Sequence, residues 1–231
     1  MPELHLYGVV VSAFVAKVRI VLDHKGLAYE EASPPGGYGS AAYRALVPAG
    51  SVPGLIVDGA PLHDSNAIVE YLDEIAPSPP LLPRDAYDRA RARALLGFHD
   101  TRLEAAARTL FPVIKSDWRS APTAAAAAAD AAAADAAAAD AGVAAVGTAL
   151  ERLEELIDPA PFVFGAAPSL ADLAYPVTLQ MAEMLSAELD RPLTLTPKVE
   201  AWRAATAALP AVARSLDLTR DAMERWMAGF R

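Results

Sequence analysis

Cysteine is absent from the 231 residues of this chain. Its absence excludes disulfide bonds, thiolate metal sites and every mechanism in which a protein thiol is the nucleophile. The chain has four histidines, and neither an HExxH motif nor another metal-ligand spacing includes them. We therefore expect no metal cofactor.

Positive charge is also scarce. The sequence has 20 lysines and arginines against 29 aspartates and glutamates, which gives a net charge of −9. Because phosphate binding needs a positive field, nucleic acid is not an expected partner.

Long uncharged apolar segments are a third absence. No apolar run of about 18 residues or more, the length that a transmembrane helix requires, is free of charge and proline. The N-terminus has neither a basic region nor an apolar signal stretch. We expect a soluble cytoplasmic protein that does not associate with membranes.

The first third of the chain has the pattern of a small α/β layer. Residues 4–7 alternate as a strand does, and an apolar stripe over residues 14–26 predicts a helix that ends at Gly26. Further elements are expected as a strand over 27–30, a short helix over 41–46, a hairpin over 55–63 and a helix over 66–75.

A proline-rich segment over residues 76–83 follows, and it cannot continue a helix. The rest of the chain is helical in pattern, so we predict an α/β domain over residues 1–78 and an all-α domain over residues 84–231. Within the second domain we expect one or two helices over 85–118 interrupted near Pro112, an alanine-rich helix over 124–145, a capping box at 169–172, and late helices over 197–209 and 221–230.

Two short motifs in the first domain indicate a ligand site. Ser51, Val52 and Pro53 precede a strand, and Asp64 and Ser65 open a helix. An exposed backbone edge can pair with an extended peptide, and a helix start stabilises a carboxylate. An ordinary strand-starting proline and a plain helix N-cap are the alternatives.

These motifs and the capping box, in this order around the proline-rich segment, resemble the cytosolic glutathione S-transferase superfamily, of the bacterial-like type that uses serine. The resemblance implies a thioredoxin-like domain followed by an all-helical domain, and a homodimer that acts in detoxification. It also implies glutathione as co-substrate and a small hydrophobic electrophile bound between the domains.

The resemblance also implies roles for single residues. Val52 and Pro53 would be joined by a cis peptide bond, and Val52, after Ser51, would pair with the glutathione backbone. Ser65 would bind the α-carboxylate of the γ-glutamyl group and Asp64 its ammonium group.

Ser12, just before the first helix, matches the serine that donates a hydrogen bond to the glutathione sulfur. A thiol has a pKa of about 8.5, and each unit of lowering corresponds to about 1.4 kcal/mol. A hydrogen bond to a charged group contributes about 1.5–3 kcal/mol and a helix N-terminus about 0.3–1 kcal/mol, enough to lower the thiol pKa by about one to three units. Ser12 as a mere helix cap, and Tyr7 as the thiol-activating residue, are the alternatives.

The second substrate would contact the first helices of the second domain. Phe14, Phe111 and Trp118 are candidates, together with Leu103 and Leu110, although each type is also common in a core.

The sequence therefore predicts a glutathione transferase. A glutathione-dependent peroxidase or isomerase, and a non-catalytic binding module on the same fold, are the alternatives. The missing cysteine argues against the thiol-type classes of the family.

Overall fold

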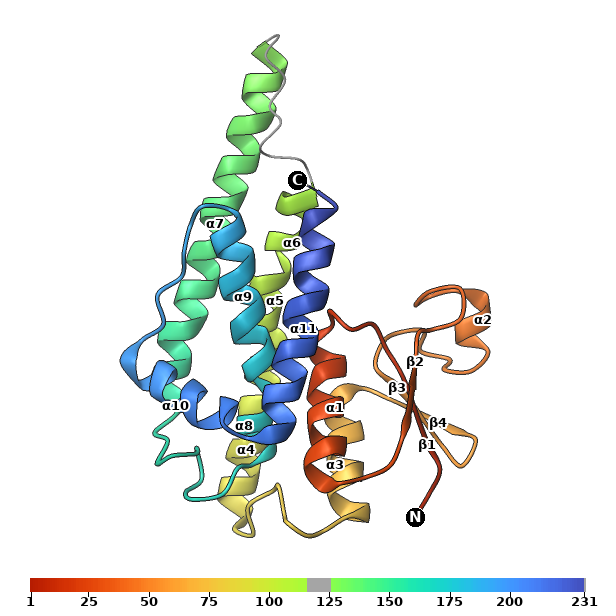
Figure 1. Ribbon diagram of the computed structural model, residues 1–231. Coiled ribbons are helices and arrows are strands. Elements are labelled where there is room, and N and C mark those ends of the chain that lie inside the picture. The colour runs from red at the N-terminus through yellow and green to blue at the C-terminus, as the bar shows by residue number, and fades with distance from the viewer. Residues whose placement is uncertain (116–125, 231) are drawn as a thin grey trace.

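The computed structural model describes residues 1–115 and 126–230, and the side chains of all of these except residues 126–132. A small sheet with its helices forms one side of the molecule and a bundle of helices forms the other (Figure 1). This is a thioredoxin-like domain followed by a helical domain, as the sequence predicted. The domain limits at 1–78 and 84–231 stay a prediction.

The sheet has the strand order β2-β1-β3-β4. Strand β1 pairs in parallel with β2 and antiparallel with β3, and β3 pairs antiparallel with β4. The elements of this domain are β1 (Leu4–Tyr7), α1 (Ala13–Lys25), β2 (Glu30–Ala32), α2 (Ala41–Arg44), β3 (Gly54–Val57), β4 (Ala60–His63) and α3 (Ser65–Ile75). Their order agrees with the pattern read from the sequence.

The helical domain surrounds α9, most of whose residues are buried. Its described elements are α4 (Ala86–Phe98), the π-helix η1 (His99–Leu103), α5 (Glu104–Arg108), α6 (Leu110–Lys115), α7 (Ala126–Leu156), α8 (Leu170–Ala174), α9 (Pro176–Glu188), α10 (Pro197–Ala207) and α11 (Pro210–Ala228).

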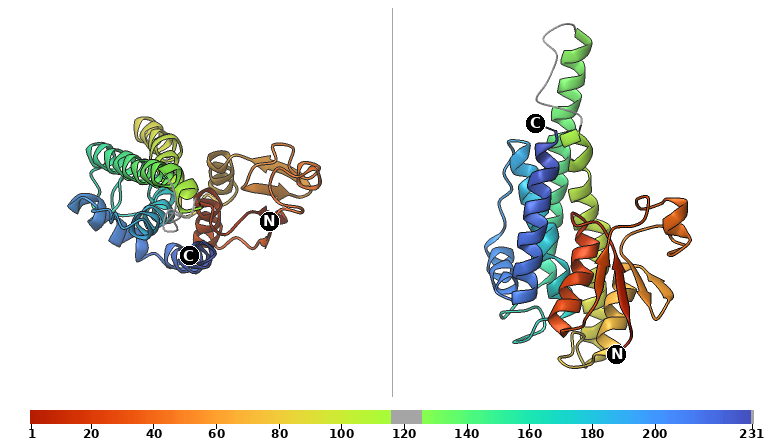
Figure 2. Two further views of the ribbon diagram at one scale, coloured as in Figure 1. Left: turned by 90° about the horizontal axis from the view of Figure 1, so that it is seen from above. Right: turned by 45° about the vertical axis from the view of Figure 1, so that its right-hand side comes forward.

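Helix α1 joins the two domains. It packs against α3 on one side and against α8 and α11 on the other (Figures 1 and 2). Its apolar residues other than the half-buried Phe14 are therefore buried, and even the side chains of Lys17 and Arg19 are 1% and 5% exposed. Gly26 ends the helix with a φ of 64°, and its N–H bonds to the carbonyls of the last turn, as predicted.

Two predicted elements are misplaced. The second strand begins at Glu30 and not at residue 27, and the last helix begins at Pro210 and not at residue 221. Pro210 is the first residue of α11, a position where the missing N–H of proline costs nothing.

The expected interruption near Pro112 is present. The helical run breaks at Thr109, between α5 and α6. Pro112 lacks the N–H that would bond to the carbonyl of Arg108, and its ring crowds that carbonyl, so a continuous helix is excluded. The π-helix η1 is a second irregularity, which the sequence did not predict.

Helix α7 agrees with the predicted alanine-rich helix over its described residues, and its N-terminal part extends beyond the bundle (Figure 1). In the described chain, its segment Ala133–Leu156 is long and apolar enough to cross a membrane by length and composition alone, and 28% of the tested window is buried. The sequence test found no such segment because Asp135 and Asp140 interrupt the alanines. Mostly buried core helices of soluble proteins satisfy the same criteria of length and composition.

Asp172 connects the start of α8 to the rest of the bundle and is fully buried. It accepts hydrogen bonds from the N–H of Ser169 at 2.8 Å, as the predicted capping box requires, and from the Ser169 hydroxyl at 2.6 Å. The N–H of Val163 and the indole N–H of Trp202 donate to the other oxygen at 2.9 and 2.7 Å.

We expect Asp172→Ala to lower the free energy of unfolding by about 3–5 kcal/mol, because it leaves several buried donors without acceptors. Denaturant unfolding followed by circular dichroism measures this change. Asp221→Ala, which removes an exposed carboxylate from α11, is the control and should change stability by less than about 0.5 kcal/mol. Equal effects of the two changes would show that the Asp172 contacts contribute little.

Candidate functional site

A cleft of about 540 Å³ lies between the sheet domain and the helical bundle. The sheet domain contributes Ser12 and Val52, and the bundle contributes Phe111, Met181 and Trp226. The bundle also contributes the charged side chains of Glu104, Arg108 and Lys115, so polar and apolar groups line both sides of the cleft. A polar and an apolar substrate can meet there.

Ser12 is the N-cap of α1 and is 6% exposed. The N–H of Val15 donates to its Oγ at 3.4 Å, a long and weak contact. The loop before Ser12 depends on Gly8, since a Cβ there would lie 2.4 Å from Val15 Cγ1. The hydroxyl proton of Ser12 has no acceptor in the described chain, so it is available to a ligand in the cleft.

The segment at Val52 presents its backbone to the cleft. The Val52-Pro53 peptide bond is cis, as the family resemblance implied. Among the described residues Val52 makes no backbone hydrogen bond. The Tyr43 hydroxyl donates a hydrogen bond to the carbonyl of Ser51 at 3.0 Å and so holds this segment in place. Ser51 and Val52 line the cleft, whereas Pro53 is buried.

Asp64 is the N-cap of α3, a role that is compatible with ligand binding. Its Oδ1 accepts the N–H groups of Asn66 and Ala67 at 2.9 and 3.1 Å. Its φ of 71° is unusual for a residue other than glycine, and such backbone strain is concentrated at functional sites. Ser65 is 6% exposed, and its hydroxyl makes no hydrogen bond in the described chain. Ligand binding by Asp64 and Ser65 stays a prediction.

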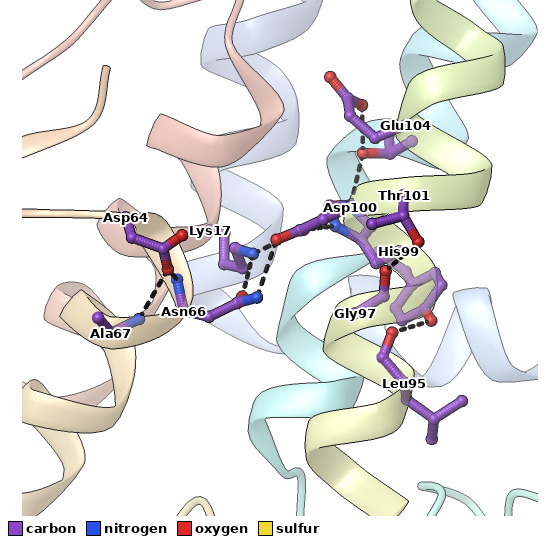
Figure 3. A network of polar contacts seen from close by, with 12 residues as sticks. Lys17, Asp64, Asn66, Ala67, Leu95, Gly97, His99, Asp100, Thr101 and Glu104 are labelled. Atoms are coloured by element: carbon purple, nitrogen blue, oxygen red, sulfur yellow. Dashed lines mark hydrogen bonds and ion pairs between the residues drawn. The ribbon is translucent and has the colours of Figure 1, made fainter. Parts of the chain in front are cut away.

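A network of buried and half-buried polar side chains joins this helix start to the bundle (Figure 3). The Lys17 ammonium group donates to Asn66 Oδ1 at 2.6 Å and to Asp100 Oδ1 at 3.0 Å, and Asn66 Nδ2 donates to Asp100 Oδ2 at 2.8 Å. Burial lowers the pKa of Lys17, and Asp100 opposes that shift. Burial acts to raise the pKa of Asp100, but His99 and Lys17 outweigh it and the pKa is lowered.

The network continues through His99 into the bundle (Figure 3). His99 Nδ1 lies 2.6 Å from Asp100 Oδ1, and Nε2 lies 2.8 Å from Thr178 Oγ1. Complete burial lowers the pKa of His99 to about 4, although Asp100 opposes the shift. Both nitrogens of the buried ring therefore have a polar partner, Asp100 on one side and Thr178 on the other.

Glu104 also belongs to this network, and its side chain is 1% exposed. Its Oε2 accepts a hydrogen bond from the Thr178 hydroxyl at 2.9 Å, and its Oε1 accepts one from Arg108 Nε at 3.1 Å. Burial raises the pKa of Glu104, although Arg108 and the hydrogen bond from Thr178 oppose the shift. Glu104 lines the cleft beside Arg108.

The aromatic residues predicted to contact the second substrate are not all in the cleft as described. Phe14 and Phe111 both line the cleft, and the Phe111 ring lies 5.0 Å from that of Trp226. Trp118 lies outside the described residues.

Leu103 and Leu110 are fully buried in the core, so the expectation that they contact a substrate is wrong. Tyr7 is half-buried, packs against Tyr43 with ring centroids 5.9 Å apart, and does not line the cleft.

Several residues that line the cleft were not predicted from the sequence. Arg108 and Lys115 lie on either side of the helix break at Thr109, so helical periodicity does not place them on one face. Met181 and Trp226 come from α9 and α11 and have no local signal that connects them to Ser12.

A second groove of about 590 Å³ lies between η1 and α7 and contains none of the predicted site residues. In the part of the chain that the structure describes, no group of three or more His, Asp or Glu residues is placed to hold a metal ion.

Two models of one protein family match this chain. The glutathione S-transferase N-terminal domain matches residues 6–80, and the glutathione S-transferase C-terminal domain matches residues 136–205. Together the two models cover more than half of the chain.

Individual proteins agree with this match. A probable glutathione S-transferase of Oryza sativa subsp. japonica is 36% identical over 133 residues, which are 54% of this chain and 56% of the relative. The chain thus spans about half the length of such curated relatives.

Solved structures align over almost their whole length. The Tau class glutathione S-transferase of Mangifera indica has a TM-score of 0.74 at 26% identity, covering 96% of this chain and 97% of that one. The theta class enzyme of Xanthomonas axonopodis pv. citri, with glutathione bound, has a TM-score of 0.69 at 26% identity, covering 94% and 98%.

The lowered pKa of His99 makes the free energy of unfolding depend on pH. Its pKa in the folded protein, about 4, lies below the ordinary 6.5, so the unfolded chain binds the proton first. The contribution of His99 is complete above pH 6.5 and is lost as the pH falls toward 4. Between pH 6.5 and about 4.5 we expect the unchanged protein to lose about 2–3 kcal/mol more stability than His99→Asn.

The asparagine variant can still donate to Asp100 but does not titrate, and the other groups of the network are present in both proteins. Urea unfolding at a series of pH values gives the two curves. Parallel curves would show that His99 is accessible to protons in the folded state.

Proposed function

This chain belongs to the glutathione S-transferase family, and we propose that it conjugates the thiolate of glutathione to a hydrophobic electrophile. One observation supports the proposal most strongly: Ser12, Ser51 and Val52 share a single cleft with Phe111 and Trp226. A thiol-activating hydroxyl and a peptide-binding edge would thus face a wall that contains two aromatic rings.

Glutathione is proposed to bind along the sheet domain. The N–H and C=O of Val52 would pair with its cysteinyl residue as an added strand. The start of α3 would receive the γ-glutamyl end, with the N–H and hydroxyl of Ser65 on the α-carboxylate. Asp64 uses Oδ1 to cap the helix, which leaves Oδ2 for the ammonium group.

Ser12 then stabilises the thiolate. Its unused hydroxyl proton would be donated to the sulfur, and the N-terminus of α1 adds a favourable dipole. The thiol proton leaves to solvent, and no protein base is required. The thiolate attacks the electrophilic carbon of a chloronitrobenzene, a C–S bond forms, and chloride leaves with the electron pair of the C–Cl bond.

We further propose that the protein is a cytoplasmic homodimer with a role in detoxification, as is typical of this family. Glutathione-dependent peroxide reduction or isomerisation would use the same thiolate. Turnover of a hydroperoxide or of a cis-alkene acid, without turnover of a chloronitrobenzene, would favour these alternatives. Failure to bind glutathione at all would favour a non-catalytic module.

We expect Ser12→Ala to lower kcat/KM for glutathione at pH 6.5 by about tenfold to a hundredfold, the factor for losing a hydrogen bond to a charged sulfur. The kinetic pKa should rise toward that of a free thiol, about 8.5. The measurement is the rate of conjugation with chlorodinitrobenzene as a function of pH, together with glutathione binding by calorimetry.

Tyr7→Phe is the matched control, because it removes the hydroxyl of the competing residue. The loss of the weak Ser12 cap lowers stability but does not move a kinetic pKa, so the pH profile separates the two roles of Ser12. An unchanged profile in Ser12→Ala, or a shifted profile in Tyr7→Phe, would contradict the assignment.

A further inference from the structure

Two cations from the helical domain line the cleft. Arg108 ends α5 and Lys115 ends α6, and both contribute to the wall opposite Ser12. The chain as a whole has a net charge of −9 and only 20 basic residues. The cleft therefore contains two cationic side chains in a protein whose net charge is negative.

One acid lies beside these cations. Glu104 is the acidic residue among those that line the cleft, and its Oε1 accepts a hydrogen bond from Arg108 Nε at 3.1 Å. A single carboxylate can balance only one of the two cations. The cleft wall thus keeps a net positive charge.

Both cations have N–H groups that make no hydrogen bond within the described part of the chain. The side chain of Arg108 is 53% exposed, its Nε faces Glu104, and the two terminal nitrogens make no hydrogen bond in the described chain. Lys115 has no ion-pair partner among the described residues, and its Nζ lies 5.8 Å from the centre of the Trp226 ring. A planar guanidinium with a free edge matches a carboxylate in a bidentate arrangement.

The aromatic rings near these cations can pack against a planar apolar part of a substrate. The Arg108 guanidinium lies 5.1 Å from the centre of the Phe14 ring, and Phe111 and Trp226 pack against each other at 5.0 Å. A planar substrate in contact with these rings would have its edge near both cations.

We infer that the second substrate is an aromatic or similarly planar electrophile that bears a carboxylate, which Arg108 and Lys115 bind. This inference rests on the proposed function and deepens it. The cations face the carboxylate at one end of the substrate, and the electrophilic carbon faces the glutathione sulfur at Ser12.

The test compares two electrophiles of one shape, para-chloro-meta-nitrobenzoate and its uncharged amide. The ratio of kcat/KM for the acid to kcat/KM for the amide is measured for the unchanged protein, Lys115→Gln, Arg108→Gln and the double variant. Each single change should lower this ratio about tenfold, the factor for one charge-assisted hydrogen bond, and the double variant more. Lys115→Gln breaks no ion pair in the described chain and remains informative if Arg108→Gln does not fold.

Arg102→Gln is the matched control, because it removes a cation that lines the other groove and not the cleft. Its ratio should equal that of the unchanged protein. A ratio that does not respond to Lys115 or Arg108 would overturn the inference while leaving the proposed function intact, since the amide would still react. A protein that conjugates neither electrophile would instead overturn the proposed function.

Glutathione has a glycine carboxylate, which is the competing partner for these cations. The same variants are therefore assayed with glutathione and with its glycine ethyl ester, at a fixed concentration of the amide. If the cation changes alter the preference between these two thiols, and not the acid-to-amide ratio, the cations bind glutathione and the inference is wrong.

Discussion

The structure depends on the ammonium group of Lys17, which is buried where the two domains meet. A buried charge without partners costs several kcal/mol, so the protein must keep Asp100 and Asn66 around it. Lys17 belongs to α1, Asn66 to the start of α3 and Asp100 to the π-helix η1. One electrostatic requirement therefore fixes the positions of three elements that the chain separates widely.

The position of the residues that line the cleft follows from this arrangement. Ser12 begins the helix that carries Lys17, and Ser65 precedes Asn66, so both predicted glutathione contacts are adjacent to the network. In the other direction, Asp100 contacts His99, which is connected through Thr178 to Glu104 in the cleft. The sheet domain thus supplies the site for the thiol, and the bundle supplies a positive, aromatic wall for its partner.

Local patterns in the sequence predicted much of this. Alternation, an apolar stripe, a glycine cap and prolines identified the order of elements in the first domain, and the motifs at Ser12 and Val52 identified one side of the cleft. Strand β2 was misplaced because its three residues are all exposed and have no alternation. The other side of the cleft was mostly hidden, since Thr178 and Glu104 are 74 positions apart and no periodicity links them.

The central claim is that glutathione lies with its sulfur beside Ser12 and its γ-glutamyl end at the start of α3. A crystal structure of the protein with glutathione tests it most directly. The account predicts the sulfur within hydrogen-bonding distance of Ser12 Oγ, Val52 paired with the ligand backbone and the α-carboxylate on Ser65. A sulfur directed at Tyr7, or a ligand bound in the groove between η1 and α7, would contradict it.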